Sequence, residues 1–147
     1  MAKLARVPEV WVAFYSFAFH FVWEMLQAPA YAGMSTIPHW DGVLVCTQAT
    51  FGDVGFAITA FWITAALRRS RNWMQSPTKA DVAVFLAVGI LLTVAFEYYY
   101  VEIAGRWTYA SWLPLVPPFG TGLGPLLQWV LIPLPVLGLS RRQLRLS

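Results

Sequence analysis

Charged residues are scarce in this chain of 147 residues. They make up only 12% of it, while hydrophobic residues make up 59%; a soluble domain has roughly 25% charged and 45–50% apolar residues. The mean hydropathy is +0.59. So few charges cannot cover the surface of a soluble globule, and intrinsic disorder is excluded because it requires low hydrophobicity and high charge. The composition therefore predicts a small integral membrane protein with one domain over residues 1–147.

Cysteine and histidine, the usual ligands of metal and redox centres, are nearly absent. The single cysteine, Cys46, excludes an intrachain disulfide and any multi-cysteine zinc or iron–sulfur site. The two histidines, His20 and His39, are too few for the ligand set of a membrane di-iron oxygenase. No glycine-rich phosphate loop or nucleophile elbow stands out in the sequence. We expect no cofactor and no metal.

Four long apolar stretches cover about residues 8–31, 42–67, 81–104 and 119–139. Each has the roughly 20 residues that a helix needs to cross ~30 Å of hydrocarbon. Backbone groups in lipid have no water partner, so the stretches should be helices, and none shows the two-residue alternation of a barrel strand. The predicted fold class is all-α, a polytopic membrane protein with four transmembrane helices in an antiparallel bundle.

Basic residues at the ends of these stretches predict the orientation of the bundle. Lys3 and Arg6 precede the first stretch, others lie between the second and third and after the fourth, and only Arg106 lies between the third and fourth. Four spans therefore place every Lys and Arg but Arg106 on one side, which is the cytoplasm by the positive-inside rule. We expect both termini in the cytoplasm and, given the short loops, the inner membrane of a bacterium. A net charge of +3 located at membrane boundaries predicts no nucleic-acid partner.

A cleavable signal peptide is the alternative at the N-terminus. Basic residues, an apolar run and the sequence Ala-Pro-Ala at residues 28–30 resemble the three parts of such a peptide. However, His20 and Glu24 interrupt the apolar region that a signal peptide requires. We therefore take residues 8–31 as the first transmembrane helix.

Acidic and amide side chains fall inside the apolar stretches. An ionisable group in hydrocarbon costs at least ~2.5–3.5 kcal/mol on insertion scales and is a functional candidate by default. In the first stretch His20, Glu24 and Gln27 are spaced i, i+4 and i+7, so they share one helix face. The other stretches contribute Gln48 and Asp53, Glu97, and Gln128. Because neighbouring helices are antiparallel, we expect all these groups in one layer between the bilayer centre and the external face.

Three acids in one layer predict acid–base chemistry, since like charges repel and a carboxyl group that stays protonated is a proton donor. A histidine paired with a carboxylate is a proton-relay group. The predicted catalytic residues are His20, Glu24, Asp53 and Glu97. Aromatic residues, which make up 16% of the chain, favour a pocket for a flat or polyene-like molecule. The predicted substrate-binding residues are Gln27, Gln48, Tyr100, Trp107 and Gln128.

One pair of motifs resembles the EXPERA group of four-helix membrane proteins, which includes sterol isomerase. The motifs are His20-Phe-Val-Trp-Glu24 and, in the next stretch, Val45-Cys-Thr-Gln-Ala-Thr50. In that group a His and a Glu on one helix and an acid on the next transfer protons at a carbon–carbon double bond, and the resemblance implies these roles here. The chain departs from the pattern at Gln48, and its nearest acid is Asp53.

A second fragment is similar to an element of the membrane lycopene cyclases. The stretch Gly105-Arg-Trp-Thr-Tyr109 has the form Gly-x-Trp-x-Tyr, and those enzymes also protonate a polyene. Their Pro-x-Glu-Glu motif is absent, and Pro125-Leu-Leu-Gln128 stands in its place. Both resemblances imply chemistry on an isoprenoid, a membrane lipid or another apolar small molecule.

The preferred hypothesis is therefore an isomerase- or cyclase-like membrane enzyme, or a binder of such a molecule, that acts by intramembrane proton transfer. Several alternatives remain open. The same acids could serve a small proton-coupled transporter, which at this size would work best as a homo-oligomer. The polar layer could instead hold together a non-catalytic assembly or regulatory subunit. One nitrogen and three oxygens from the predicted catalytic residues would also suit a divalent metal.

Overall fold

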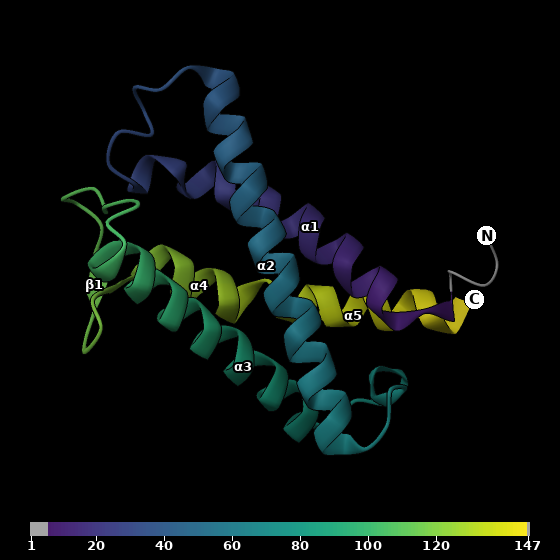
Figure 1. Cartoon of the computed structure of the whole chain (residues 1–147). Helices are drawn as coiled ribbons and strands as arrows, with labels where there is room; N and C mark the ends of the chain where they lie inside the picture. Colours follow the sequence, from purple (N-terminus) through teal and green to yellow (C-terminus); the bar gives the residue numbers. More distant parts are fainter. Residues whose placement is uncertain (1–5, 147) are drawn as a thin grey trace.

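The structure, a computed structural model, describes residues 6–146, so the predicted role of Lys3 lies outside the described residues. The chain is mostly helical (Figure 1). Its helices are α1 (Pro8–Gln27), α2 (His39–Arg68), α3 (Lys79–Tyr98), α4 (Leu123–Leu131) and α5 (Pro133–Leu146). Short helical turns follow at Ala28–Ala30, Trp73–Gln75 and Tyr99–Ile103, and β1 (Leu115–Val116) pairs antiparallel with β2 (Thr121–Gly122).

Three helical segments are long and apolar enough to cross a membrane. They are α2 (His39–Arg68), α3 with its following turn (Lys79–Ile103), and α4 with α5 (Leu123–Leu146). These segments fit the predicted membrane protein. Helix α1 does not reach the same hydropathy, although it has 20 residues, because its polar side chains lower the mean. Those polar residues are on the buried face of α1: Ser16, His20, Glu24 and Gln27.

The helix ends differ from the predicted ranges where proline and local pairing intervene. Helix α1 ends at Gln27 rather than near residue 31, and the turn that follows contains Pro29, which has no N–H for a helical hydrogen bond. The last predicted stretch began at residue 119, but residues 121–122 pair with β1, so α4 starts at Leu123. The same stretch breaks at Ile132, immediately before Pro133, and then continues to Leu146.

Contacts at the two ends of the bundle show that α1 extends along the whole length of the bundle. At one end the guanidinium Nε of Arg71 lies 2.7 Å from Glu9 Oε1, and Arg141 Nε donates to the backbone oxygen of Gln75 at 3.2 Å. At the other end the connections after α1 and α3 pair with each other, with the Ala32 N–H donating to the Thr108 oxygen at 2.9 Å. The start of α1 and the end of α5 lie side by side (Figure 1).

The apolar core occupies the end of the bundle that holds the chain termini and the α2–α3 connection. Phe61, Trp73 and Phe85 are almost fully buried there, together with Val12 of α1. Close packing between α3 and α4 depends on Gly89, because a Cβ at this position would lie 2.0 Å from the Trp129 ring. The acids and amides predicted for the site lie in the other half of the bundle.

Candidate functional site

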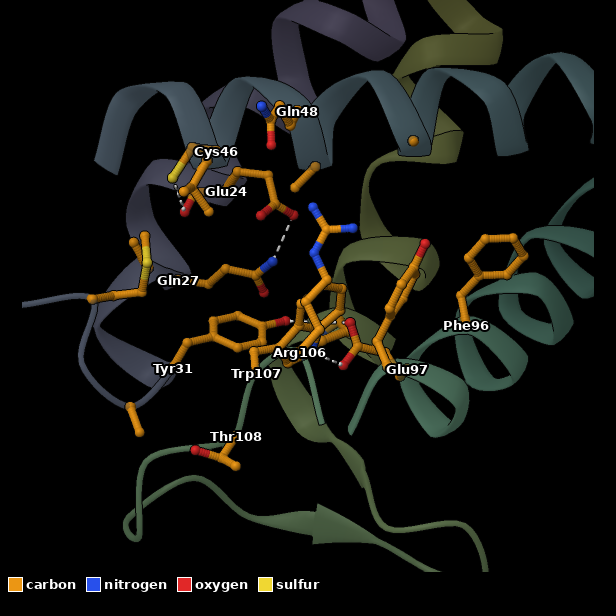
Figure 2. A pocket seen from close by; sticks show the side chains of 18 of the residues that line it. Glu24, Gln27, Tyr31, Cys46, Gln48, Phe96, Glu97, Arg106, Trp107 and Thr108 are labelled. Carbon is orange, nitrogen blue, oxygen red and sulfur yellow. Dashed lines mark hydrogen bonds between the residues drawn. The ribbon is translucent and has the colours of Figure 1, made fainter. Parts of the chain in front are cut away.

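A cavity of about 780 Å³ lies in the half of the bundle opposite the chain termini. Helices α1, α2, α3 and α4 all line it, together with the loop after α3 (Figure 2). Every predicted site residue except His20 is part of its wall. The structure thus places the predicted polar residues of four separate segments around one space, and His20 lies behind that wall with only 1% of its surface exposed.

The side-chain amide of Gln128 connects three helices at the wall of this cavity. Its Nε2 donates to Asp53 Oδ2 at 2.8 Å and to Glu24 Oε1 at 3.1 Å, and it lies 2.7 Å from His20 Nδ1. Its Oε1 accepts a hydrogen bond from Gln27 Nε2 at 3.1 Å. Gln128 is therefore the hub of a buried hydrogen-bond cluster, which we call the Gln128 cluster.

A tryptophan sets the direction of the hydrogen bonds in the Gln128 cluster. Trp23 Nε1 can only donate, and it donates to Gln27 Oε1 at 3.0 Å. The Gln27 nitrogen must then face Glu24, at 2.7 Å from Oε1, and the Gln128 oxygen. This orientation turns the Gln128 nitrogen toward His20, so that Nδ1 of the imidazole accepts the hydrogen bond.

Every acceptor that the Gln128 nitrogen contacts has a donor. The Gln128 nitrogen carries two hydrogens, but three acceptors lie within hydrogen-bond distance of it. Glu24 Oε1 also accepts from Gln27 at 2.7 Å, so no acceptor lacks a hydrogen, and Asp53 Oδ2 lies 3.3 Å from His20 Nδ1. The other Asp53 oxygen accepts from Trp129 Nε1 at 3.0 Å. The arrangement therefore brings a carboxyl group and an imidazole together next to the cavity.

Glu24 presents one half of its carboxyl group to the cavity. Oε1 accepts the hydrogen bonds from Gln27 and Gln128, whereas Oε2 has no hydrogen-bond partner among the residues that the structure describes. Figure 2 shows the carboxyl group facing into the pocket. A carboxyl group held by one oxygen and open at the other can exchange a proton with a molecule in the cavity.

Glu97 belongs to a different hydrogen-bond group in the same cavity. It accepts from Tyr31 Oη at 3.4 Å and from Trp107 Nε1 at 3.3 Å, and also from the Tyr109 hydroxyl. Burial and the nearby Glu97 raise the pKa of the Tyr109 phenol, which therefore stays a donor. Glu97 thus joins α3 to the two loops at this end of the bundle, and it does not contact the Gln128 cluster through a hydrogen bond.

Arg106 extends into the cavity from the loop after α3 (Figure 2). Its guanidinium carbon lies 5.3 Å from the centre of the Tyr100 ring and 5.9 Å from that of Trp107, and the two rings are themselves 4.7 Å apart. Within residues 6–146 no carboxylate lies within ion-pair distance of this guanidinium. Tyr100 and Trp107 therefore place a cation at the cavity by cation–π contacts.

A metal site has no support in the geometry of the acids. Among the residues that the structure describes, no three His, Cys, Asp or Glu side chains come close enough together to hold an ion. The acids are spread over two hydrogen-bond groups, and each is already served by protein donors. The divalent-metal alternative therefore has no set of neighbouring ligands among the described residues.

Three functional side chains were not identified from the sequence. Trp23, Trp129 and Tyr109 each donate a hydrogen bond to an amide or a carboxyl group of the site. Two of them could have been found, because Trp23 lies one helical turn before Gln27 and Trp129 directly follows Gln128. An indole beside a membrane-embedded amide or acid is a candidate donor, whereas we interpreted the aromatic residues only as packing or as a pocket wall.

Comparisons with protein-family models, with curated proteins and with solved structures find no match for this chain.

Proposed function

We propose that this is a membrane protein that binds a lipid-soluble molecule in the cavity and transfers a proton to it. The observation that carries the proposal is the geometry of Glu24. One of its oxygens is fixed by two amides and the other faces the cavity, while the same Gln128 amide joins it to Asp53 and His20. Proton transfer needs such a donor beside a second proton-binding group.

The proposed reaction is an isomerisation or cyclisation of an isoprenoid-like molecule. The Glu24 O–H bond breaks as the π-electron pair of a double bond forms a new C–H bond, which leaves a carbocation on the adjacent carbon. A neighbouring C–H bond, or one formed after ring closure, then breaks to restore a double bond. Its proton goes to the Asp53 carboxylate, 3.3 Å from His20, and returns between turnovers to Glu24 in the same cavity wall, so no other reactant is consumed.

The resemblance of the sequence to EXPERA-type proteins supports the same roles, because it pairs a His and a Glu on one helix with an acid on the next. His20 and Glu24 lie one turn apart on α1, and the acid of the next helix, Asp53, meets them through Gln128. The aromatic residues on the cavity wall, Phe56, Phe96, Tyr100 and Trp107, would stabilise a developing cation through their π faces. Glu97, which the sequence grouped with the catalytic acids, here serves to position the loops.

The proposal includes four membrane spans with both termini in the cytoplasm of a bacterium. Helix α1 has no exposed charge in its middle, and it passes from the Arg71 end of the bundle to the Ala32 end beside the three apolar segments. Its polar side chains face the inside, where protein groups rather than lipid surround them. A homo-oligomer is compatible with this arrangement.

The test is to extract lipids from the purified protein, identify any stoichiometric apolar molecule by mass spectrometry, and incubate that molecule with Glu24→Gln protein. We expect the variant to bind the molecule but to lose at least ~100-fold in turnover, the range that general acid–base catalysis contributes. Glu102→Gln is the matched control, because Glu102 is exposed and lies outside the cavity wall, so it should keep full activity.

Other outcomes would contradict the proposal in different ways. Unchanged turnover in Glu24→Gln would remove Glu24 as the proton donor. Proton-coupled flux of the molecule in proteoliposomes, without chemical change, would favour the transporter. Protein that purifies with no small molecule, and that loses a membrane partner in Gln substitutions, would be an assembly or regulatory subunit.

A further inference from the structure

Two small residues of α2 leave the wall of the cavity open. Ala49 and Gly52 line the cavity and are exposed on the surface of the described structure. A Cβ added at Gly52 would meet no atom within 4 Å. On the opposite side Phe96 of α3 lines the same cavity, and its ring is 4.8 Å from that of Phe56. The cavity therefore reaches the surface between the first half of α2 and the last part of α3.

This opening faces the region where lipid would lie. Helices α2 and α3 approach each other near the α2–α3 connection and diverge toward the other end (Figure 1), and both are long and apolar enough to cross a membrane. The opening is located beyond the Phe56–Phe96 contact, on the diverging side. A molecule dissolved in the bilayer could pass between the helices there without crossing water.

Hydrogen-bonding capacity in the cavity favours an acidic head group. Glu24 and Asp53 are served by amide and indole donors, and Glu97 is served by three donors from the loops. Arg106 is the one cationic residue of the cavity wall; its guanidinium lies over two rings, and its N–H groups have no acceptor among the described residues. Guanidinium groups bind carboxylate or phosphate oxygens through their N–H groups, often in pairs.

We propose that the ligand is an amphiphile with a carboxylate or phosphate head, that it enters from the bilayer between α2 and α3 past Ala49 and Gly52, and that its head binds Arg106. Its apolar chain then lies along Phe56 and Phe96. The volume of about 780 Å³ is in the range of pockets that enclose a small molecule. This inference rests on the proposed function, since it names the class of molecule that the same site binds.

The test uses a photoreactive diazirine derivative of palmitic acid, in nanodiscs of phosphatidylcholine, with labelled peptides mapped by mass spectrometry. We expect labelling of peptides from α2 and α3 that line the cavity. Gly52→Trp should reduce this labelling about tenfold by filling the opening, a change equivalent to ~1.4 kcal/mol in affinity. The matched control is Gly55→Trp, which adds the same side chain to an exposed position three residues away, outside the cavity wall; it should label as the unsubstituted protein does.

The role of Arg106 in binding the head group is tested with a separate variant and separate probes. Arg106→Gln should weaken labelling by the acid about tenfold or more, because the variant loses the charge that strengthens a hydrogen bond to a carboxylate. The corresponding diazirine alcohol should label weakly and equally in both proteins, and a diazirine alkyl phosphate should behave as the acid does. Preference for the alcohol, or equal labelling of Gly52→Trp and Gly55→Trp, would overturn the inference. Glu24→Gln should label as the unsubstituted protein does. Unchanged turnover in this variant would contradict the proposed proton transfer, whereas unchanged labelling of Gly52→Trp would contradict the proposed entry path.

Discussion

The amide of Gln128 holds its acceptors in place from a buried position on α4. Gln128 is 2% exposed and is the donor to Asp53 and Glu24 from a different helix. In Gln128→Met the side chain keeps its length but loses the amide NH2 and C=O groups, so buried acceptors are left without donors. We expect the free energy of unfolding to fall by about 1–3 kcal/mol, measured by denaturation in mixed micelles.

Gln48 is the control for the same chemical change. It lines the cavity as Gln128 does but is exposed, and the structure gives it no hydrogen bond to another described residue. Gln48→Met should therefore leave the free energy of unfolding within about 0.5 kcal/mol of the original value. Equal losses in the two variants would show that the Gln128 hydrogen bonds contribute nothing specific to stability.

The Tyr109 hydroxyl predicts how stability changes at alkaline pH. Burial, followed by the charge of Glu97, raises the pKa of Tyr109 in the folded protein, while in the unfolded chain the phenol titrates near pH 10. The folded state therefore keeps a proton that the unfolded state loses. We expect stability to decrease as the pH rises above about 10, and Tyr109→Phe, measured by unfolding at several pH values, to reduce this slope. An unchanged slope would contradict the role of Tyr109.

At the scale of helices, the contact between α3 and α4 depends on a glycine. A Cβ at position 89 would lie 2.0 Å from Cε3 of Trp129, and the indole of Trp129 also donates to Asp53. Gly89→Ala should push the indole away and cost about 1–3 kcal/mol through overpacking, measured as a lower free energy of unfolding. Because the Trp129 indole donates to Asp53, the proposed proton acceptor, Gly89→Ala should also lower turnover.

The control at this scale is Gly55→Ala on α2, where an added Cβ meets no atom within 4 Å. A glycine in the middle of a helix is less favourable than alanine by roughly 0.5–1 kcal/mol, so this variant should be as stable as the original protein or slightly more stable. Loss of stability in Gly55→Ala, to the same extent as in Gly89→Ala, would show that the Trp129 contact is not the cause.

Local spacing predicted the helices and the polar face of α1, and the antiparallel order of the helices predicted that the polar groups lie in one layer. Three apolar stretches correspond to segments long enough to span a membrane, and the i, i+4, i+7 spacing on α1 matches its buried face. The pairing of the polar groups could not be predicted in this way. Whether Glu97 meets Asp53 or the loop residue Tyr109 depends on how the chain after α3 folds back, and that contact is between residues of different elements.

Helix ends were also less predictable than helices, for a reason that differs at each site. Hydropathy continues through Ala28–Ala30, but Pro29 changes the backbone there into a short turn. Hydropathy gives no signal at Ile132, and the break follows from the proline at the next position. Trp129 was missed because an indole contributes both an apolar surface and one donor, and a hydropathy pattern records only the first.

At the scale of the whole molecule, the basic residues gather at one end of the bundle. Arg71 and Arg141 contact groups at that end, where the α2–α3 connection, the start of α1 and the end of α5 meet, while Arg106 lies at the other. This asymmetry predicts that the α2–α3 connection is cytoplasmic. The loops that carry Ala32 and Thr108 are then external.

Single cysteines in a Cys46→Ala background test this orientation. Ser76→Cys and Ser35→Cys are a matched pair, because both serines are exposed and lie in connections at opposite ends of the bundle. A maleimide that cannot cross membranes should label Ser35→Cys in intact cells and Ser76→Cys only in inverted vesicles. The reverse pattern would contradict the positive-inside assignment. An epitope at the N-terminus distinguishes four spans from three. If α1 crosses the membrane, the epitope is cytoplasmic and should be accessible only in inverted vesicles. If α1 does not cross, the epitope should be accessible in intact cells.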